Sequence, residues 1–244
     1  MNSATKTEVI DLENSNIVCK DLGDFPMGIS DAVGANLASI PIICGGVFNN
    51  GSYHSADKCF RYAEGEWQHF VTMLDRRRYA AGIVYDNALH IFGGYDSDEN
   101  ARLQSSEIVN EDGTSTEGPQ LPEWIYRHAI ASINSTVSII SGGYTNAYSG
   151  QTWYFNHATQ KFQPGPNLLE KRYGHSSGTI TDQETGEKIV IVAGGSNNIN
   201  NLIDSTEILL NGKWITGKIH MKNIDLSIFC LFALHVLYFV TVAS

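Results

Sequence analysis

The sequence predicts an all-β fold built from repeated four-stranded antiparallel sheets. The 244 residues include 23 glycines but only 6 prolines, with 10% aromatic residues, a composition typical of short strands joined by tight turns. A pair of adjacent glycines also recurs four times at a period of roughly 50 residues, each time after an apolar run. With 42% hydrophobic residues, a chain of this length can bury its core as one domain.

The glycine pairs are expected to end the second strand of each repeat. At such a point the chain turns where a side chain would clash or where a positive φ is needed, and glycine meets both demands. The four pairs are Gly45-Gly46, Gly93-Gly94, Gly142-Gly143 and Gly194-Gly195.

An arginine marks the start of three repeats. It lies fifteen positions before the glycine pair as Arg78 and Arg127, and Ser30 takes that place in the first repeat. Arg172 is assigned the same part in the fourth repeat, which is longer because residues 182–186 lie between its first two strands. Each marker precedes a strand, a turn and a second strand, which together predict a β-hairpin.

Two further strands complete each repeat. The third has a Ser/Thr-Glu-aliphatic core, seen at residues 7–10, 106–109 and 206–209. The fourth follows a tight turn and carries an aromatic residue, such as Trp67 or Trp214. Because an aromatic ring can fill the wedge between twisted sheets, these tryptophans are expected to be structural.

In glycine pair, spacing and late tryptophan, the pattern from Thr7 to Trp214 resembles the kelch repeat. The resemblance implies a kelch-type β-propeller over residues 1–216, in which each four-stranded repeat is one blade. We expect four complete blades and an N-terminal half blade, which is fewer than the family usually has. The ring is therefore expected to be incomplete, and the chain to be a truncated or partial propeller. The units are expected near 7–26 (partial), 30–70, 78–121, 127–166 and 172–216.

Residues 217–244 do not follow the repeat. Within them, 226–243 carry no formal charge and follow three lysines, and a helix of that length reaches about 27 Å against a hydrocarbon core of about 30 Å. This apolar tail is interpreted either as a membrane anchor or as an unstructured segment. The first residues lack the apolar core of a secretory signal, so the chain as written is expected to be cytoplasmic. Membrane and secreted forms stay open, because two glycosylation sequons begin at Asn50 and Asn134.

Charge and motifs argue against several function classes. A formal net charge of -10 is the opposite of what a phosphate backbone attracts, so no nucleic acid is expected as a partner. The eight histidines form no short-spaced ligand pair, and no nucleophile elbow or phosphate loop occurs. We therefore expect no metal, no cofactor and no catalytic residues. The alternative is a remnant of a propeller enzyme of the galactose-oxidase type, or a secreted kelch protein.

The loops that follow the glycine pairs vary in sequence and would gather on one face of a propeller. Tyrosines and polar side chains in such loops are typical of protein interfaces. The candidate binding residues in these loops are Tyr53, Tyr95, Asp96, Arg102, Tyr144, Tyr148 and Asn197.

The kelch resemblance adds a second set at the start of the first strands. In kelch-like adaptors, arginines at this position point into the central mouth and capture acidic motifs, because a guanidinium binds carboxylates in a bidentate manner. The alternative is that each guanidinium packs between blades. The function expected from both sets is a protein-interaction module, acting as a substrate-recognition or scaffold unit for a protein or acidic peptide. The residues are Arg78, Arg127 and Arg172, followed by Tyr79, His128 and Tyr173.

Two of the four cysteines fall on strands expected to be neighbours. Cys44 ends a second strand and Cys59 begins a third strand of the same repeat. We expect them to form a disulfide in an oxidising compartment and to stay reduced in the cytosol.

Overall fold

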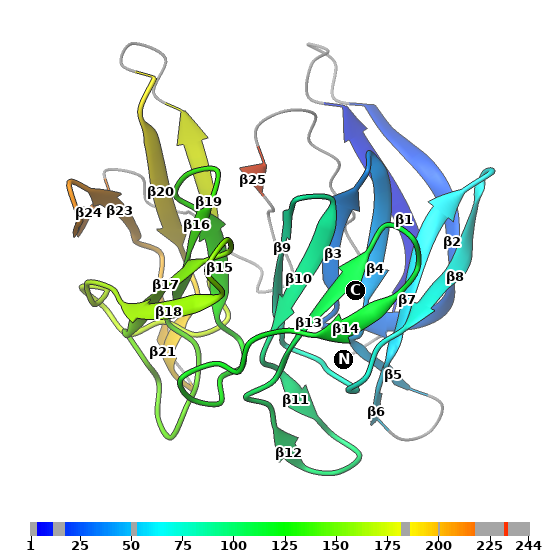
Figure 1. The fold of residues 1–244 in the computed structure, drawn as a ribbon, viewed down its shortest axis with the longest axis horizontal. Helices are drawn as coiled ribbons and strands as arrows, with labels where there is room; N and C mark the ends of the chain where they lie inside the picture. Colours follow the sequence, from blue (N-terminus) through cyan, green and yellow to red (C-terminus); the bar gives the residue numbers. More distant parts are fainter. Residues whose placement is uncertain are drawn as a thin grey trace. The chain divides into compact units, whose positions relative to one another are not determined.

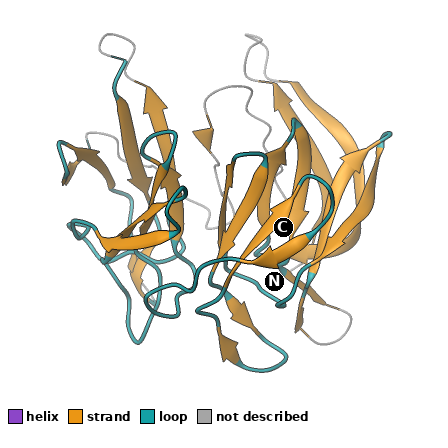
Figure 2. Ribbon diagram, viewed as in Figure 1, coloured by secondary structure: helices purple, strands orange, loops and turns teal. Residues whose placement is uncertain are grey.

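The computed structural model describes residues 4–11, 18–49, 53–181, 186–199, 201–217 and 232–233. All regular structure in these residues is β-strand (Figure 2). The described residues divide into two compact units, the first running to Tyr126 and the second beginning at Arg127 (Figure 1).

Unit 1 contains two sheets in which four strands follow one another in chain order. All neighbouring strands are antiparallel, as the sequence predicts. The first sheet consists of β3 (Val33–Leu37), β4 (Ile40–Cys44), β7 (Lys58–Ala63) and β8 (Glu66–Thr72). The second consists of β9 (Ala81–Tyr85), β10 (Ala88–Phe92), β13 (Ser106–Asn110) and β14 (Ser115–Glu117).

A third sheet of unit 1 contains the expected half blade, formed by β1 (Ala4–Asp11) and β2 (Val18–Ser30). Thr7 lies opposite Gly23, and its hydroxyl donates a hydrogen bond to the Gly23 carbonyl at 2.6 Å. Trp67 Nε1 in turn donates to Thr7 Oγ1 at 2.9 Å, which fastens this sheet to the next. The sheet is completed by a hairpin at the end of β2, made of β5 (Val47–Asn49) and β6 (Tyr53–Ser55).

Unit 2 contains two further sheets of the same order. The first consists of β15 (Ala129–Ser132), β16 (Val137–Ser141), β17 (Thr152–Asn156) and β18 (Lys161–Pro164). The second consists of β19 (Ser176–Thr181), β20 (Lys188–Ala193), β23 (Thr206–Leu210) and β24 (Lys213–Thr216), with β25 (Phe232–Ala233) in parallel beside β19. Two short hairpins follow glycine pairs, β11 (Tyr95–Asp96) with β12 (Ala101–Arg102) in unit 1, and β21 (Ser196–Asn198) with β22 (Asn201–Leu202) in unit 2.

The predicted fold class is therefore confirmed: an all-β chain of four-stranded antiparallel blades. That the ring of blades is incomplete stays a prediction. The expectation of a membrane anchor at 226–243 falls outside the described residues except for β25. Within the part of the chain that the structure describes, no helix has the length and apolar character needed to cross a bilayer.

The glycine pairs have the structural role that the sequence predicts. Gly45 and Gly46 have φ angles of 65° and 95°, and the other three pairs are also positive. A Cβ on Gly45 would lie 2.4 Å from the Arg77 carbonyl oxygen, and one on Gly142 would lie 2.4 Å from that of Arg172. Because no L-residue has room there, the chain can leave the second strand of the blade at these points only through glycine.

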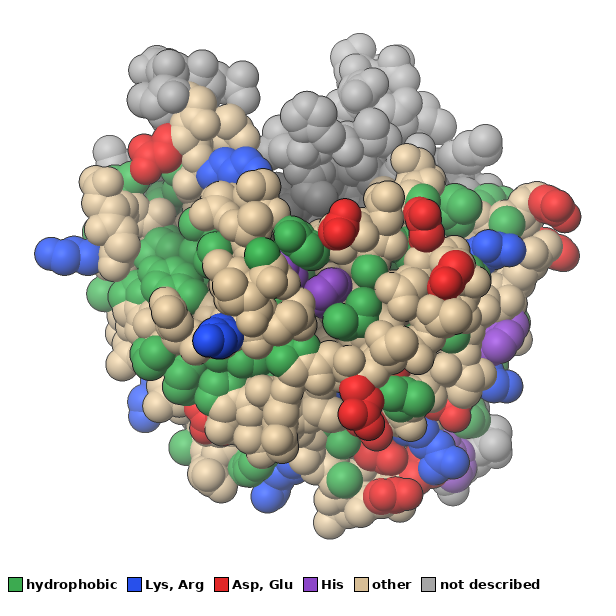
Figure 3. Space-filling model, in the orientation of Figure 1, with side chains coloured by type: hydrophobic (Ala, Val, Ile, Leu, Met, Phe, Trp, Pro, Cys, Tyr) green, Lys and Arg blue, Asp and Glu red, His purple; other side chains and the backbone are tan. Residues whose placement is uncertain are grey.

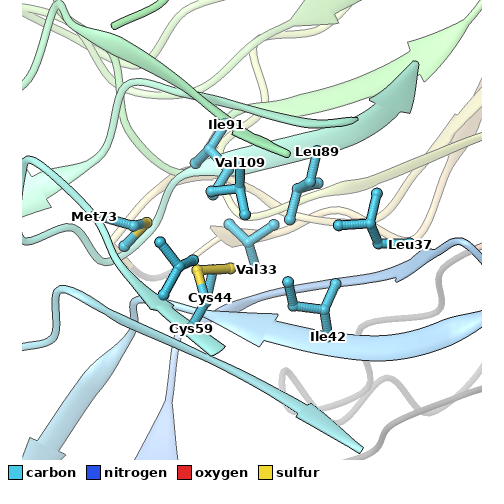
Figure 4. Packing of buried hydrophobic residues seen from close by; sticks show 10 residues of the cluster. Val33, Leu37, Ile42, Cys44, Cys59, Met73, Leu89, Ile91 and Val109 are labelled. Atoms are coloured by element: carbon cyan, nitrogen blue, oxygen red, sulfur yellow. A yellow bond between two sulfur atoms is a disulfide. The ribbon is translucent and has the colours of Figure 1, made fainter. Parts of the chain in front are cut away.

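The core of unit 1 lies between its blades. Val33 and Leu37 from one sheet face Leu89 and Val109 from the next, all nearly fully buried (Figure 4). A second cluster, around Phe25, joins the half blade to β4, β7 and β8. Unit 2 has an equivalent cluster that includes Trp214. The tryptophans expected to be structural, Trp67 and Trp214, are 7% and 5% exposed.

The predicted disulfide is present in the first of these clusters. Cys44 on β4 and Cys59 on β7 lie opposite each other and are bonded, and neither is more than 1% exposed (Figure 4).

A buried ion pair joins the blades at the recurrent glutamate. Glu107 on β13 accepts a hydrogen bond from Arg77 Nη2 at 2.7 Å, and both side chains are 1% exposed. The same carboxylate accepts the backbone N–H groups of Leu74 at 2.8 Å and Asp75 at 2.9 Å. Arg77 also donates to the Gly93 carbonyl at 2.8 Å, which links the ion pair to the glycine pair. We call the ion pair of Arg77 and Glu107, with these backbone hydrogen bonds, the interblade clamp.

Unit 2 repeats this clamp with Arg172 and Glu207. Arg172 Nε donates to Glu207 Oε1 at 3.0 Å, and Nη1 donates to the Gly194 carbonyl at 2.9 Å. The carboxylate of Glu207 again accepts a leucine N–H, that of Leu169, at 2.7 Å. The recurrent glutamate is therefore a structural residue, as its repetition indicates.

The same slot in the first complete blade is apolar. Backbone pairing places Ile29 at the position of Arg77 and Phe60 at that of Glu107, and both pack in the cluster around Phe25. Position 26, which corresponds to the Leu74 donor, is proline and has no N–H to satisfy. The third blade follows this apolar version, with Pro122, Ile125 and Trp153. Blades that have the Arg–Glu ion pair thus also have the backbone N–H that the glutamate accepts. In blades where apolar residues replace the ion pair, a proline replaces that N–H donor.

Candidate functional site

Unit 1 carries a surface cluster of aromatic rings and arginines where its blades begin. Arg78, just before β9, pairs with Tyr95 through both backbone hydrogen bonds, at 3.1 and 2.9 Å. Tyr79 follows with φ 58°, which turns its ring back toward this pair. We call the group the aromatic–arginine cluster; it comprises Arg78, Tyr79, Tyr95, Arg102, Trp124 and Tyr126.

The two arginines of the cluster lie against rings. Arg78 Cζ is 4.6 Å from the Tyr79 ring centroid and 5.4 Å from that of Tyr95. Arg102 Cζ is 4.6 Å from the Trp124 centroid. These are cation–π distances, each worth about 0.5–1 kcal/mol at an exposed site.

Tyr126 connects the rings to one another. Its centroid lies 6.2 Å from Tyr79, 5.8 Å from Tyr95 and 6.4 Å from Trp124, and the last pair is stacked at 14°. All four aromatic side chains are only partly buried. The cluster is therefore a continuous aromatic surface with a guanidinium at either side.

The guanidinium groups have hydrogen-bonding capacity to spare. Among the residues that the structure describes, neither Arg78 nor Arg102 donates a side-chain hydrogen bond, and the Nε of Arg78 is itself buried. The neighbouring Arg77, by contrast, donates to Gly93, Asp75 and Glu107. Arg78 is thus held by rings while its charged face stays available to an acceptor.

The hairpin that carries Tyr95 and Arg102 is fastened to its neighbour. Asp98 accepts hydrogen bonds from His54 Nδ1 at 2.6 Å and from the Ser55 N–H at 2.9 Å, which joins β5–β6 to β11–β12. Ser97 N also donates to Ser55 Oγ at 2.8 Å. The hydrogen bond from His54 is the main reason that the pKa of Asp98 lies below its usual value. Both hairpins extend from the same end of the unit 1 sheets (Figure 1).

Unit 2 has a smaller cluster at the equivalent place, the tyrosine cluster of Arg127, Tyr144, Tyr148 and Tyr173. Arg127 Cζ is 5.5 Å from the Tyr173 centroid. Tyr148 lies 4.8 Å from Tyr173 and 5.3 Å from Tyr144, edge-on to the latter. Desolvation, followed by the two neighbouring phenols, raises the pKa of Tyr148.

The three arginines assigned to one position occupy three different ones. The N–H of the second glycine of a pair bonds the carbonyl of Arg77, Ile125 and Arg172, so these three residues are equivalent. Arg172 is therefore the counterpart of Arg77, and it is 1% exposed. The prediction that Arg172 occupies the same repeat position as Arg78 and Arg127 is therefore wrong. Its side chain instead forms the buried ion pair with Glu207.

Arg78 and Arg127 are not equivalent to each other either. Arg78 lies three residues before its first strand, whereas Arg127 lies two residues before β15. The hairpin of the third blade is one residue longer, since Ala129 pairs with Ser141 but Ala81 pairs with Phe92. The equal spacing to the glycine pair therefore concealed a shift in register.

His128 lies in the interior of unit 2 and not on its surface. It is 5% exposed, neither ring nitrogen has a hydrogen-bond partner among the described residues, and burial lowers its pKa to about 3. His175, at the equivalent position, is 3% exposed with a pKa of about 3 for the same first reason. Its Nε2 lies 2.9 Å from Ser141 Oγ. Both imidazoles are neutral at physiological pH.

The polar loop candidates maintain loop conformation. Asp96 is 7% exposed and accepts the Asp98 N–H at 2.9 Å. Asn197 donates to Glu170 at 2.8 Å and accepts from Asn201 at 2.7 Å. Tyr53, on β6, is 50% exposed and remains part of the accessible surface.

Sequence reasoning did not include Trp124, Tyr126, His54 or Asp98 in the site. A sequence signal for Tyr126 does exist. Tyr126 lies three residues before the first strand of its blade, and Arg78 and Tyr173 lie at the same distance before theirs. The link between His54 and Asp98 joins two loops of different blades and leaves no local pattern.

Charged side chains of both signs lie on the described surface (Figure 3). On the face drawn in Figure 3, the acidic, basic and histidine side chains of the described residues are scattered among apolar and neutral ones. Recognition by the clusters would therefore depend on short-range contacts, since the net charge is -10.

No three His, Cys, Asp or Glu side chains gather into a metal-binding set within the described ranges. The expectation of neither metal nor cofactor stays a prediction.

Comparison with known proteins supports the fold. The solved structure of YjhT matches with a TM-score of 0.78 over 89% of this chain and 78% of that chain, at 11% sequence identity. At this identity the similarity shows the fold alone, a β-propeller-like arrangement of blades. No family model matches the chain, and no curated protein matches its sequence.

Proposed function

We propose that the chain is a protein-binding propeller of the kelch type, which captures a peptide bearing acidic side chains at the aromatic–arginine cluster of unit 1. The observation that carries the proposal is Arg78, a half-buried arginine held by two rings and without a described hydrogen-bond acceptor. A substrate-recognition or scaffold role follows from such binding.

The assignment to the kelch type has its own support. The glycine pairs, their positive φ angles and the blade order recur at the predicted spacing. The interblade clamp of Arg77 with Glu107 and of Arg172 with Glu207 recurs with them.

The ligand chemistry follows from the two side-chain types. A guanidinium fork donates two parallel hydrogen bonds to a carboxylate, and charge-assisted bonds of this kind contribute about 1.5–3 kcal/mol each. The rings of Tyr79, Tyr126 and Trp124 offer a flat apolar surface for the neighbouring peptide residue. Arg102, exposed beside Trp124, suits a second carboxylate.

Binding can be tested by fluorescence anisotropy on a panel of short labelled peptides that contain glutamate, each with a glutamine version. We expect glutamate peptides to bind, glutamine versions to bind at least tenfold more weakly, and Arg78→Ala to raise the Kd by about 10- to 100-fold. The melting temperature of Arg78→Ala should stay close to that of the parent.

Arg61→Ala is the matched control. Arg61 is also half-buried and lies over a ring, with Cζ 5.0 Å from the Phe70 centroid, but it belongs to β7 and not to the cluster. Its loss removes one positive charge and one cation–π contact without touching the site. Equal weakening by both substitutions, or no preference for glutamate, would reject the proposal.

A further inference from the structure

The turn between β15 and β16 holds one of the two glycosylation sequons, Asn134-Ser135-Thr136. Asn134 and Ser135 are both exposed. A sequon can be modified only where its asparagine is accessible, and a hairpin tip meets that condition.

The geometry of the turn leaves the asparagine nitrogen available. Asn134 Oδ1 accepts hydrogen bonds from the Thr136 N–H at 2.9 Å, the Thr136 hydroxyl at 3.2 Å and the Val137 N–H at 2.8 Å. An aspartate at position 134 would supply the same acceptor oxygen. The turn therefore accounts for Oδ1 of Asn134 and gives no role to its amide nitrogen. Nδ2, which aspartate lacks, donates to no residue in the described part of the chain.

The disulfide in unit 1 is a second, independent observation. Cys44 and Cys59 are bonded to each other in the core, at no more than 1% exposure. Protein disulfides form and persist in oxidising compartments such as the secretory pathway, where sequons are also glycosylated.

We infer that Asn134 is an N-glycosylation site and that the chain folds in the secretory pathway. The donor is an oligosaccharide linked to a lipid pyrophosphate. Asn134 Nδ2 forms a bond to the anomeric carbon of the first sugar, the bond from that carbon to the phosphate oxygen breaks, and the lipid pyrophosphate leaves with the electron pair. Nδ2 loses one proton to the transferase that catalyses the step.

The glycan would stand away from the tyrosine cluster of unit 2. Arg127 lies two residues before the start of β15 at Ala129, and Asn134 lies two residues after its end at Ser132. Four strand residues separate the two ends by about 13 Å at ~3.3 Å per residue. A glycan at Asn134 therefore leaves that end of the blade open.

The test expresses the whole chain behind a cleavable secretion signal in mammalian cells, and analyses total cell protein so that misfolded chains are counted. Asn50→Gln is the background, so that mobility reports Asn134 alone. A mobility shift that peptide-N-glycosidase reverses is expected in this background. It should disappear with Asn134→Gln and with Thr136→Ala, and persist with Ser135→Ala, which changes the middle residue of the same turn.

Absence of a reversible shift in the Asn50→Gln chain, or its persistence in Asn134→Gln, overturns the site. The compartment is tested on the endogenous protein with an antibody. A glycosidase-sensitive band with two free thiols is expected; a single insensitive band with four free thiols overturns it. Neither readout depends on peptide binding, so the inference and the proposed function fail separately.

Discussion

The interblade clamp of unit 1 allows a sharp test of how the blades are held together. Replacing Glu107 alone by Phe removes the buried carboxylate beside the Arg77 guanidinium, which keeps only the more exposed carboxylate of Asp75, and it also leaves the Leu74 N–H without its acceptor. Removing one partner of a buried ion pair costs about 3–5 kcal/mol. We therefore expect Glu107→Phe and Arg77→Ile each to lower the free energy of unfolding of unit 1 by about that amount.

The combined change should be far less harmful than the sum of its parts. Leu74→Pro with Arg77→Ile and Glu107→Phe reproduces the apolar slot that the first complete blade forms with Pro26, Ile29 and Phe60. Replacing a buried pair by packed apolar residues is often neutral or stabilising. We expect the triple variant to be at least about 2 kcal/mol more stable than additivity of the single changes predicts.

Urea unfolding followed by tryptophan fluorescence measures these values, with Trp67 and Trp124 reporting on unit 1 and Trp153 and Trp214 on unit 2. Glu117→Gln is the control, because Glu117 lies opposite Glu107 on β14 but is exposed, and it should change stability by less than about 0.5 kcal/mol. Strict additivity, or single variants within about 1 kcal/mol of the parent, would refute the reasoning.

Two further predictions concern pH and the glycine pairs. The folded pKa values of His128 and His175, about 3, lie below the ordinary 6.5, so the unfolded chain binds more protons and stability falls as pH drops below 6.5. Between pH 7.5 and 5 the two together should cost unit 2 about 4 kcal/mol, and a flat profile in urea unfolding would contradict this. Gly45→Ala should destabilise unit 1 by more than about 3 kcal/mol, because its Cβ would lie 2.4 Å from a carbonyl oxygen. Gly65→Ala, also at positive φ but with open space around it, should cost only about 1 kcal/mol, and equal losses in thermal melts would argue against the steric account.

The sequence predicts most of the fold because each blade is defined locally. Strand order, hairpin turns and glycine pairs depend on residues close together along the chain, and four copies of the pattern reinforce one another. The bridge between Cys44 and Cys59 could be predicted for the same reason, since both cysteines belong to neighbouring strands of one blade.

The candidate site could be predicted only in part. The sequence predicts Arg78, Tyr79, Tyr95 and Arg102 as site residues. Trp124 and Tyr126 reach them from the segment that follows the blade, and only the repeat position of Tyr126 indicates that approach. Histidine is a residue type common in functional sites, so the sequence suggests His128 as a site residue. The structure buries its side chain in the core.

By itself, then, the sequence determined the all-β blades, their glycine joints and the recurrence of Ser/Thr-Glu cores, because those are short-range properties of backbone sterics and strand alternation. Only the tertiary structure decided which arginine is buried and which is free. Arg172 lies four residues before its first strand and enters the clamp with Glu207, whereas Arg78 lies three residues before its first strand and stays partly exposed against Tyr79. Spacing along the chain cannot reveal that difference, because register is set by pairing between strands, and burial is set by the blade that packs alongside.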